Sequence, residues 1–251
     1  MAFLLAVLAV VLLYAAATVR RRRGRNEWNR SLDVAFVLVR DGPVDPVAIE
    51  LFRARAAVLE ERLAAELHRH RATPDRPFRF VVRGPVDQRS PRPQLSGDGV
   101  LDLASHTWNT WRWTRAIDRA DGFASEAYDT RIYVVVRAPR DSSRRFVEGA
   151  SEQGGAVGTL EVDLDTSMVD YALFVATHEL FHTVGALDKY DATGRTTIPD
   201  GLPEPNAPWP QMFADPMARG RVLSPGREEP PDSLDVLRVG PLTAKEIGWV
   251  L

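Results

Sequence analysis

The segment SLDVAFVLVR, residues 31–40, is the stretch of this 251-residue chain from which the fold can be built outward. Its β-branched and apolar residues predict a strand. Residues 45–71 follow with apolar side chains at near-helical spacing among many charges, so we expect a long amphipathic helix there. A strand followed by such a helix is typical of a layered domain with helices packed on a sheet.

Similar patterns continue along the chain. Further strands are expected at residues 77–86, 131–137 and 154–165, and further helices at 108–120, 170–184 and 243–249. The glycines in 154–165 favour an edge strand, and Thr243 and Glu246 have the spacing of a helix capping box. Residues 87–99 form a polar loop, and residues 195–235 contain nine of the 18 prolines, which predicts a long irregular stretch. This order of elements indicates an α/β or α+β sheet domain.

The N-terminal residues form a separate unit. Residues 2–19, AFLLAVLAVVLLYAAATV, are apolar and uncharged, and as a helix they would span about 27 Å, enough for a bilayer core. We expect a single-pass transmembrane anchor with a basic flank in residues 1–25, followed by one domain in residues 26–251. The arginines after the apolar run place that domain in the cytoplasm by the positive-inside rule, with a periplasmic or extracellular location as the alternative. A leader cleaved after the small residues 15–17 is a second interpretation, which would give a secreted protein.

Charge and cysteine content exclude several classes of function. The formal net charge of −2 combines five arginines and no acid in residues 1–25 with 27 Lys and Arg against 34 Asp and Glu in the rest, a net −7. A domain of that sign is not expected to bind nucleic acid. The absence of cysteine excludes disulfides, thiolate metal sites and a cysteine nucleophile.

The residues that indicate a reaction lie in ATHELFHTVGALDKYD, residues 176–191. His178 and His182 are four apart, so both imidazoles of a helix can reach one metal ion. Glu179, beside the first histidine, can accept a proton from a metal-activated water. Gly185 can end the helix in a left-handed conformation, which lets the chain turn back and present Asp188 to the same ion. Two imidazoles and one carboxylate leave an open position on Zn²⁺, which is typical of a catalytic site.

The string HExxHxxGxxD resembles the metzincin metallopeptidases, in particular the branch typified by snapalysin, in which Asp replaces the third His. The resemblance implies an α+β fold: a twisted mixed β-sheet, an active-site helix after an edge strand, a turn that places a methionine beneath the metal, and a short C-terminal helix. Met217 in the sequence ADPMA matches that methionine better than Met212 does, since a Pro-Met-small sequence suits a turn. The chain departs from several metzincins at Arg219, where they have a tyrosine.

The resemblance implies a zinc endopeptidase, a hydrolase that cleaves peptide or protein substrates with Glu179 as general base, and the apolar run at residues 2–19 would make it membrane-anchored. Tyr190 or Arg219 is expected to stabilise the oxyanion. The predicted strand with Gly155, Val157 and Thr159 would pair with an extended substrate, or its glycines would merely serve an edge-strand turn. The alternative function is a non-catalytic, zinc-stabilised and membrane-anchored domain that binds a protein partner.

Overall fold

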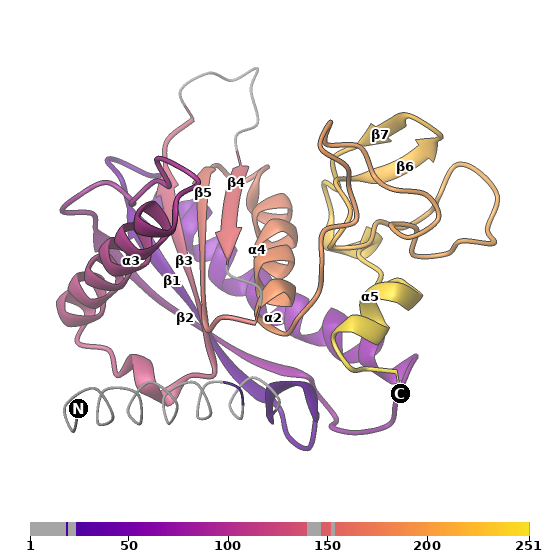
Figure 1. The fold of residues 1–251 in the computed structure, drawn as a ribbon, viewed down its shortest axis with the longest axis horizontal. Helices are drawn as coiled ribbons and strands as arrows, with labels where there is room; N and C mark the ends of the chain where they lie inside the picture. Colours follow the sequence, from indigo (N-terminus) through magenta and orange to yellow (C-terminus); the bar gives the residue numbers. More distant parts are fainter. Residues whose placement is uncertain (1–18, 20–23, 140–146, 152–153, 251) are drawn as a thin grey trace, which may run out of the picture.

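The fold is built on a five-stranded mixed sheet, seen in the computed structural model of residues 19, 24–139, 147–151 and 154–250 (Figure 1). The strand order is β2-β1-β3-β5-β4, with bounds β1 (Leu32–Arg40), β2 (Phe78–Asp87), β3 (Thr130–Arg137), β4 (Val147–Ser151) and β5 (Val157–Asp163). The first four strands in that order are parallel, and β4 runs antiparallel to β5 at one edge. The expected mixed sheet is therefore confirmed.

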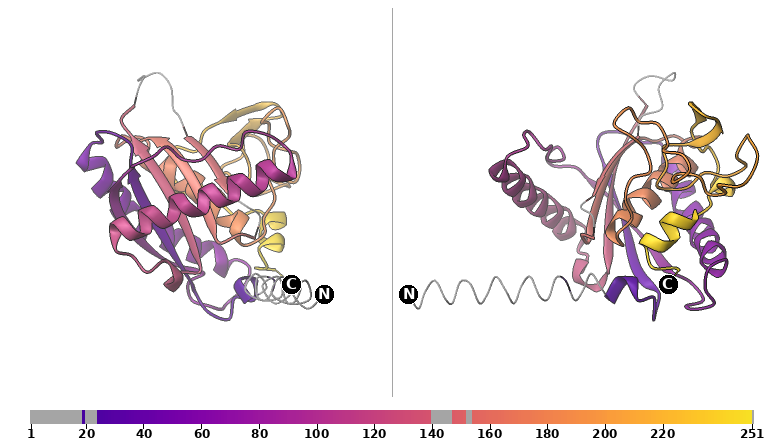
Figure 2. Two further views of the ribbon diagram at one scale, coloured as in Figure 1. Left: turned by 60° about the vertical axis from the view of Figure 1, so that its left-hand side comes forward. Right: turned by 45° about the vertical axis from the view of Figure 1, so that its right-hand side comes forward.

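Helices cover both faces of the sheet because the strands are apolar on both sides. Helices α2 (Pro46–His68) and α4 (Val169–Thr183) pack on one face, and α3 (Val100–Asp121) lies across the other (Figures 1 and 2). Alternate residues of β1 divide between the two cores: Phe36 belongs to the larger one and Val37 to the smaller one. The larger core fixes α4 against the sheet, and α4 carries the HExxH sequence.

The chain after α4 forms a largely irregular layer on the outer side of that helix (Figure 1). It contains the hairpin β6 (Arg221–Ser224) and β7 (Arg227–Glu229), the 3₁₀ turn η2 (Leu234–Val236) and helix α5 (Pro241–Glu246), while the 3₁₀ turn η1 (Ser125–Ala127) precedes β3. The proline-rich stretch is thus mostly irregular, as expected. Its buried residues, among them Met217 and Leu237, join the larger core.

Four details differ from the expectations. Helix α3 begins at Val100 rather than at residue 108, directly after Gly99. The strand at 154–165 is not at the edge: β5 is paired on both sides, and β4, which the sequence did not indicate, takes the edge position. The α5 capping box is wrong, because the N-cap is Gly240. Thr243 donates to the buried Asp215 at 2.9 Å instead.

Apart from Val19, the predicted transmembrane run lies outside the residues that the structure describes. Among the described residues, no helix is both long and apolar enough to cross a bilayer. Arg25, which the sequence placed in the basic flank, is buried and donates to the carbonyls of Gly154 and Gly155 at 2.7 and 3.0 Å. Arg25 therefore belongs to the folded domain, because its guanidinium group is hydrogen-bonded to backbone carbonyls that precede β5.

Candidate metal centre

Helix α4 places His178 and His182 one above the other on one face, as their spacing predicts. Their Nε2 atoms are 3.0 Å apart. The helix ends where expected: Gly185 has φ +106°, its N–H donates to His182 O at 3.0 Å, and the N–H of Ala186 donates to Phe181 O at 3.0 Å. This pair of bonds is a Schellman motif, which reverses the chain and starts the loop that returns to the histidines.

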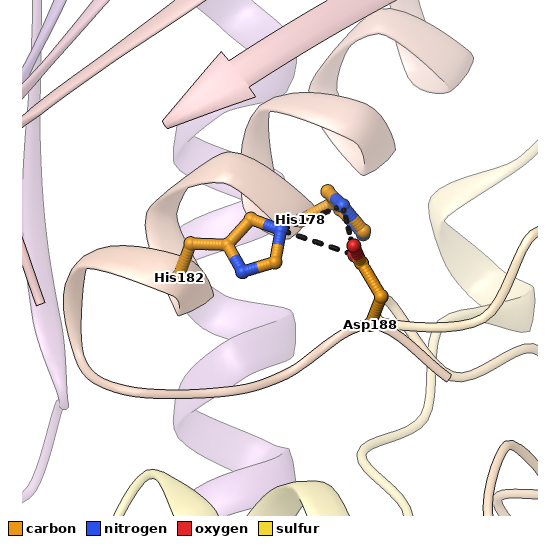
Figure 3. A group of neighbouring side chains, drawn as sticks. All are labelled: His178, His182 and Asp188. Atoms are coloured by element: carbon orange, nitrogen blue, oxygen red, sulfur yellow. Dashed lines mark hydrogen bonds and ion pairs between the residues drawn. The ribbon is translucent and has the colours of Figure 1, made fainter. Parts of the chain in front are cut away.

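Asp188 lies on that returning loop and faces both imidazoles (Figure 3). Its Oδ1 is 3.2 Å from the Nε2 of His178 and 3.2 Å from the Nε2 of His182. The hydrogen bond with His178 lowers the pKa of the Asp188 carboxyl, with burial acting against it. The three side chains could hold a metal ion, because each turns one ligand atom toward the same point.

Backbone carbonyls fix the tautomer of both histidines. The Nδ1 of His178 lies 2.9 Å from Pro216 O, and the Nδ1 of His182 lies 2.9 Å from Ala186 O. A carbonyl only accepts hydrogen bonds, so each Nδ1 carries a proton, and the Nε2 atoms are the ones left to bind Asp188 or a metal ion. Without a metal ion, a proton on His178 Nε2 bonds to the carboxylate of Asp188: burial lowers the pKa of His178, but this hydrogen bond and the neighbouring carboxylates outweigh it and raise the pKa above its ordinary value. A metal ion would take the place of that proton. Outer hydrogen bonds such as those of the two Nδ1 atoms are typical of metal-ligating histidines.

Glu179 points from α4 toward the edge strand β4 and is 3% exposed. Its carboxylate accepts a hydrogen bond from the Ser151 hydroxyl, which also donates to the Glu179 carbonyl at 3.1 Å. Gly149 faces the same carboxylate, and a Cβ at that position would overlap it. Burial raises the pKa of Glu179 above its ordinary value, which suits a group that must accept and return a proton.

The turn at residues 215–218 lies directly beneath His178. Ala218 N–H donates to Asp215 O at 3.0 Å, which closes the turn, and Pro216 at its second position supplies the carbonyl for His178. Met217 in this turn is fully buried, whereas Met212 is 64% exposed. The geometry therefore favours Met217 as the methionine below the histidines.

The two oxyanion candidates are arranged in a stack beside His178. The Tyr190 ring lies 5.9 Å from the His178 ring with an interplanar angle of 22°, and the Arg219 guanidinium carbon lies 5.6 Å from the Tyr190 ring centroid. Burial raises the pKa of Tyr190 to about 12, so its hydroxyl is protonated at neutral pH. Tyr190 thus lies beside His178, and the exposed side chain of Arg219 contacts the Tyr190 ring.

The predicted substrate strand needs correction. Val157 and Thr159 pair with β3 on one side, and Thr159 pairs with Ala150 of β4 on the other, so this strand has no free edge for a peptide. Gly155 precedes β5, and its carbonyl accepts from Arg25. The edge strand on this side of the sheet is β4, which pairs antiparallel to β5 and contacts α4 through Ser151 and Glu179.

The sequence did not identify the groups that hold Glu179 and Asp188 in place. Ser151 and Gly149 lie in a short segment without a clear alternating pattern. Lys189, which is 3% exposed, donates from Nζ to Glu246 at 2.6 Å and to Leu187 O at 2.8 Å. The sequence signal that could have marked this position is the lysine itself, which is one of only two in the chain and directly follows a predicted ligand.

Comparison with known proteins adds no assignment. No family model matches the chain, and no curated protein matches its sequence. The resemblance to metzincins therefore rests on the motif residues themselves.

Proposed function

We propose that this protein is a zinc-dependent endopeptidase of the metzincin type. The observation that carries the proposal is the convergence of His178, His182 and Asp188, whose ligand atoms lie 3.0–3.2 Å apart. Tetrahedral zinc with bonds of about 2.0–2.1 Å requires ligand atoms about 3.3 Å apart, close to this arrangement. Nitrogen and oxygen donors of this kind suit Zn²⁺, and three protein ligands leave one position open.

Zinc bound by these residues would supply a Lewis acid that polarises the scissile carbonyl and makes a water molecule more acidic. Glu179 then takes the proton from the attacking water and passes it to the nitrogen of the leaving amine. Tyr190, protonated and beside His178, is the better-placed group to donate a hydrogen bond to the oxyanion. The backbone carbonyls of Pro216 and Ala186 keep the two imidazoles in the ligating tautomer.

The substrate strand in this proposal is β4. Its outer edge has no partner strand among the described residues, and Ser151 and Gly149 contact the carboxylate of Glu179. An extended peptide that pairs with this edge would run past the metal ligands. We therefore propose that β4, and not the strand with Gly155, Val157 and Thr159, pairs with the substrate.

The test is a zinc analysis combined with cleavage of a broad peptide library by wild type and Glu179→Ala. We expect wild type to cleave, and the variant to retain zinc but lose cleavage. Cleavage that persists in Glu179→Ala would contradict the mechanism. Glu179→Gln, which keeps the side-chain shape, serves as the matched variant.

One observation favours the alternative function, a non-catalytic zinc-stabilised domain that binds a protein partner. Glu179 is almost fully buried, and the Ser151 hydroxyl already binds its carboxylate. In this case the β4 edge would bind a partner strand without hydrolysis. Wild type that holds zinc and cleaves no peptide would support this second function.

A further inference from the structure

The folded domain starts with a short segment, residues 25–28, that is bound to distant parts of the chain before β1 begins. Three of its side chains donate hydrogen bonds to backbone carbonyls that lie 129 to 219 residues further along the sequence. These carbonyls belong to the turn before β5, to the end of α4 and to the end of α5. We call residues 25–28 the N-terminal clasp, because they join three elements that surround the proposed metal site.

Trp28 fixes the clasp in the larger core. Its side chain is 1% exposed, and its indole Nε1 donates to Ile247 O at 2.6 Å. The ring packs edge-on against Phe78 and Trp249, with centroids 5.4 and 5.9 Å apart. The backbone of Trp28 has φ +52°, a left-handed conformation that a residue with a side chain keeps only where its surroundings hold it there. The residues just before Trp28 therefore start from a fixed position.

Asn26 binds the end of α4 directly. This half-buried residue donates from its side-chain amide to Val184 O at 2.6 Å. Val184 is the C-cap of α4, and the carbonyls at the end of a helix have no amide partner within the helix. Asn26 supplies such a partner from outside, one residue before Gly185, where the chain reverses toward Asp188.

Arg25 reaches the same end of α4 through Gly154. Its buried guanidinium donates to Gly154 O at 2.7 Å and to Gly155 O at 3.0 Å. The N–H of Gly154 in turn donates to His182 O at 2.7 Å. A single residue thus joins the Arg25 side chain to the backbone of a proposed metal ligand. A cation at this end also complements the partial negative charge of the helix C-terminus.

The end of α4 determines the geometry of two of the three proposed ligands. His182 contributes one ligand atom, and its Nδ1 is bonded to Ala186 O at 2.9 Å in the loop that leads to Asp188. Movement of this helix end would change the 3.2 Å distance between His182 Nε2 and Asp188 Oδ1. His178 lies one turn earlier, and its Nδ1 is bonded to Pro216 O instead.

We propose that Arg25 and Asn26 are positioning residues of the metal centre, which hold the end of α4 so that His182 and Asp188 face one ion. The proposal rests on the proposed zinc site. It does not rest on peptide hydrolysis, because the non-catalytic alternative needs the same geometry. Both residues follow the apolar run 2–19, so a leader cleaved after residues 15–17 would leave them in the mature chain.

The test is the zinc affinity of the full chain, measured by competition with a chelator under conditions in which circular dichroism shows every variant folded. Arg25→Met and Asn26→Ala each remove one connection to the end of α4. The matched control is Arg30→Met, which removes a guanidinium from the same stretch of chain, but one that binds Asp129 before β3. Arg25→Lys is the conservative variant, since an ammonium group can donate to the same carbonyls.

We expect Arg25→Met and Asn26→Ala each to lose about tenfold in zinc affinity, the lower end of the range for outer partners of metal ligands. Arg30→Met should keep the wild-type affinity, and Arg25→Lys should regain most of it. The visible ligand-field bands of the cobalt-substituted protein should change in Arg25→Met and Asn26→Ala and stay as in wild type in Arg30→Met, because only the first two variants alter the ligand geometry.

Wild-type affinity and unchanged cobalt bands in Arg25→Met and Asn26→Ala would overturn the proposal. So would an equal loss of affinity in Arg30→Met, since affinity would then follow stability alone. If Arg25→Met does not fold, Asn26→Ala decides the question by the same criteria. A wild type that binds no zinc would overturn the zinc site together with this proposal, whereas a wild type that binds zinc and cleaves no peptide leaves the expected affinities unchanged.

Discussion

At the scale of single residues, the proposed hydrolysis depends on how closely β4 approaches Glu179. Gly149 leaves no side chain between the strand and the carboxylate, and a methyl group there would overlap it. We predict that Gly149→Ala displaces Glu179 and reduces peptide cleavage by at least about tenfold, since a shift of about 1 Å has large catalytic costs. Zinc content should stay at the wild-type level, because the three ligands do not contact Gly149. The kcat of peptide hydrolysis and the zinc content of the same samples check this.

Gly24→Ala is the control for that variant, because a Cβ at Gly24 meets nothing within 4 Å. If Gly149→Ala cleaves peptides as fast as wild type does, Glu179 is not held in place by this contact.

Asp188 is the one carboxylate among the three proposed metal ligands. Asp188→Ala removes a ligand atom that lies 3.2 Å from both imidazole nitrogens. We predict a loss of zinc affinity larger than the roughly 10–100-fold typical of outer hydrogen-bonding partners. Competition with a chelator measures the affinity. Full zinc occupancy in the variant under that competition would remove Asp188 from the ligand set.

At the scale of elements, α5 holds the loop that carries Asp188. The N–H of Leu187 donates to Glu246 at 2.9 Å, the Nζ of Lys189 donates to the same carboxylate, and the N–H of Lys189 donates to Met217 O at 2.8 Å. Lys189→Met leaves Glu246 without its buried cation, so the loop should loosen. We predict about a 10–100-fold loss of zinc affinity, as for other outer partners of metal ligands.

The matched control is Lys245→Met. Lys245 is the chain's other lysine, and it is exposed on α5, the helix that also carries Glu246. Equal zinc affinity in the Lys189 and Lys245 variants would show that α5 does not position Asp188.

The sequence predicted best the elements that have a local signal. The β-branched runs gave β1 and β3, helical spacing gave α2, and the HExxH pattern with Gly185 gave the end of α4 and the position of Asp188. Strand β4 has no such signal, because its place depends on antiparallel pairing with β5, which is a long-range property. Thr243 misled for a similar reason: its hydroxyl serves the buried Asp215, a partner 28 residues away in the chain.

At the scale of the whole molecule, the start of the domain is tied to the sheet by Arg30 and Asp129. Burial opposes ionisation of Asp129, but hydrogen bonds from Arg30 and from Asp33 N–H outweigh it and hold the pKa of the carboxyl below its ordinary 3.8. A depressed folded-state pKa stabilises the fold above pH 3.8, and this contribution is lost as the pH falls through the lower folded value. We predict that Arg30→Met lowers the free energy of unfolding at pH 7 by about 0.5–1 kcal/mol.

The difference between wild type and Arg30→Met should shrink as the pH falls below 3.8, where Asp129 takes up a proton in both proteins. Urea unfolding at several pH values, followed by tryptophan fluorescence, measures it. Arg40→Met is the control, since its partner Asp87 is 74% exposed and gives little stabilisation. A difference that stays constant down to pH 3 would contradict the role assigned to this ion pair.

The central claim is that His178, His182 and Asp188 form an open zinc site. X-ray absorption spectroscopy on the full chain, loaded with one equivalent of Zn²⁺, tests it most directly. The account predicts a first shell of two imidazole nitrogens and one carboxylate oxygen at about 2.0–2.1 Å, completed by oxygen from solvent. The imidazole contribution should disappear in a double variant of His178 and His182. A shell without imidazole, or one that is unchanged in the double variant, would contradict the account.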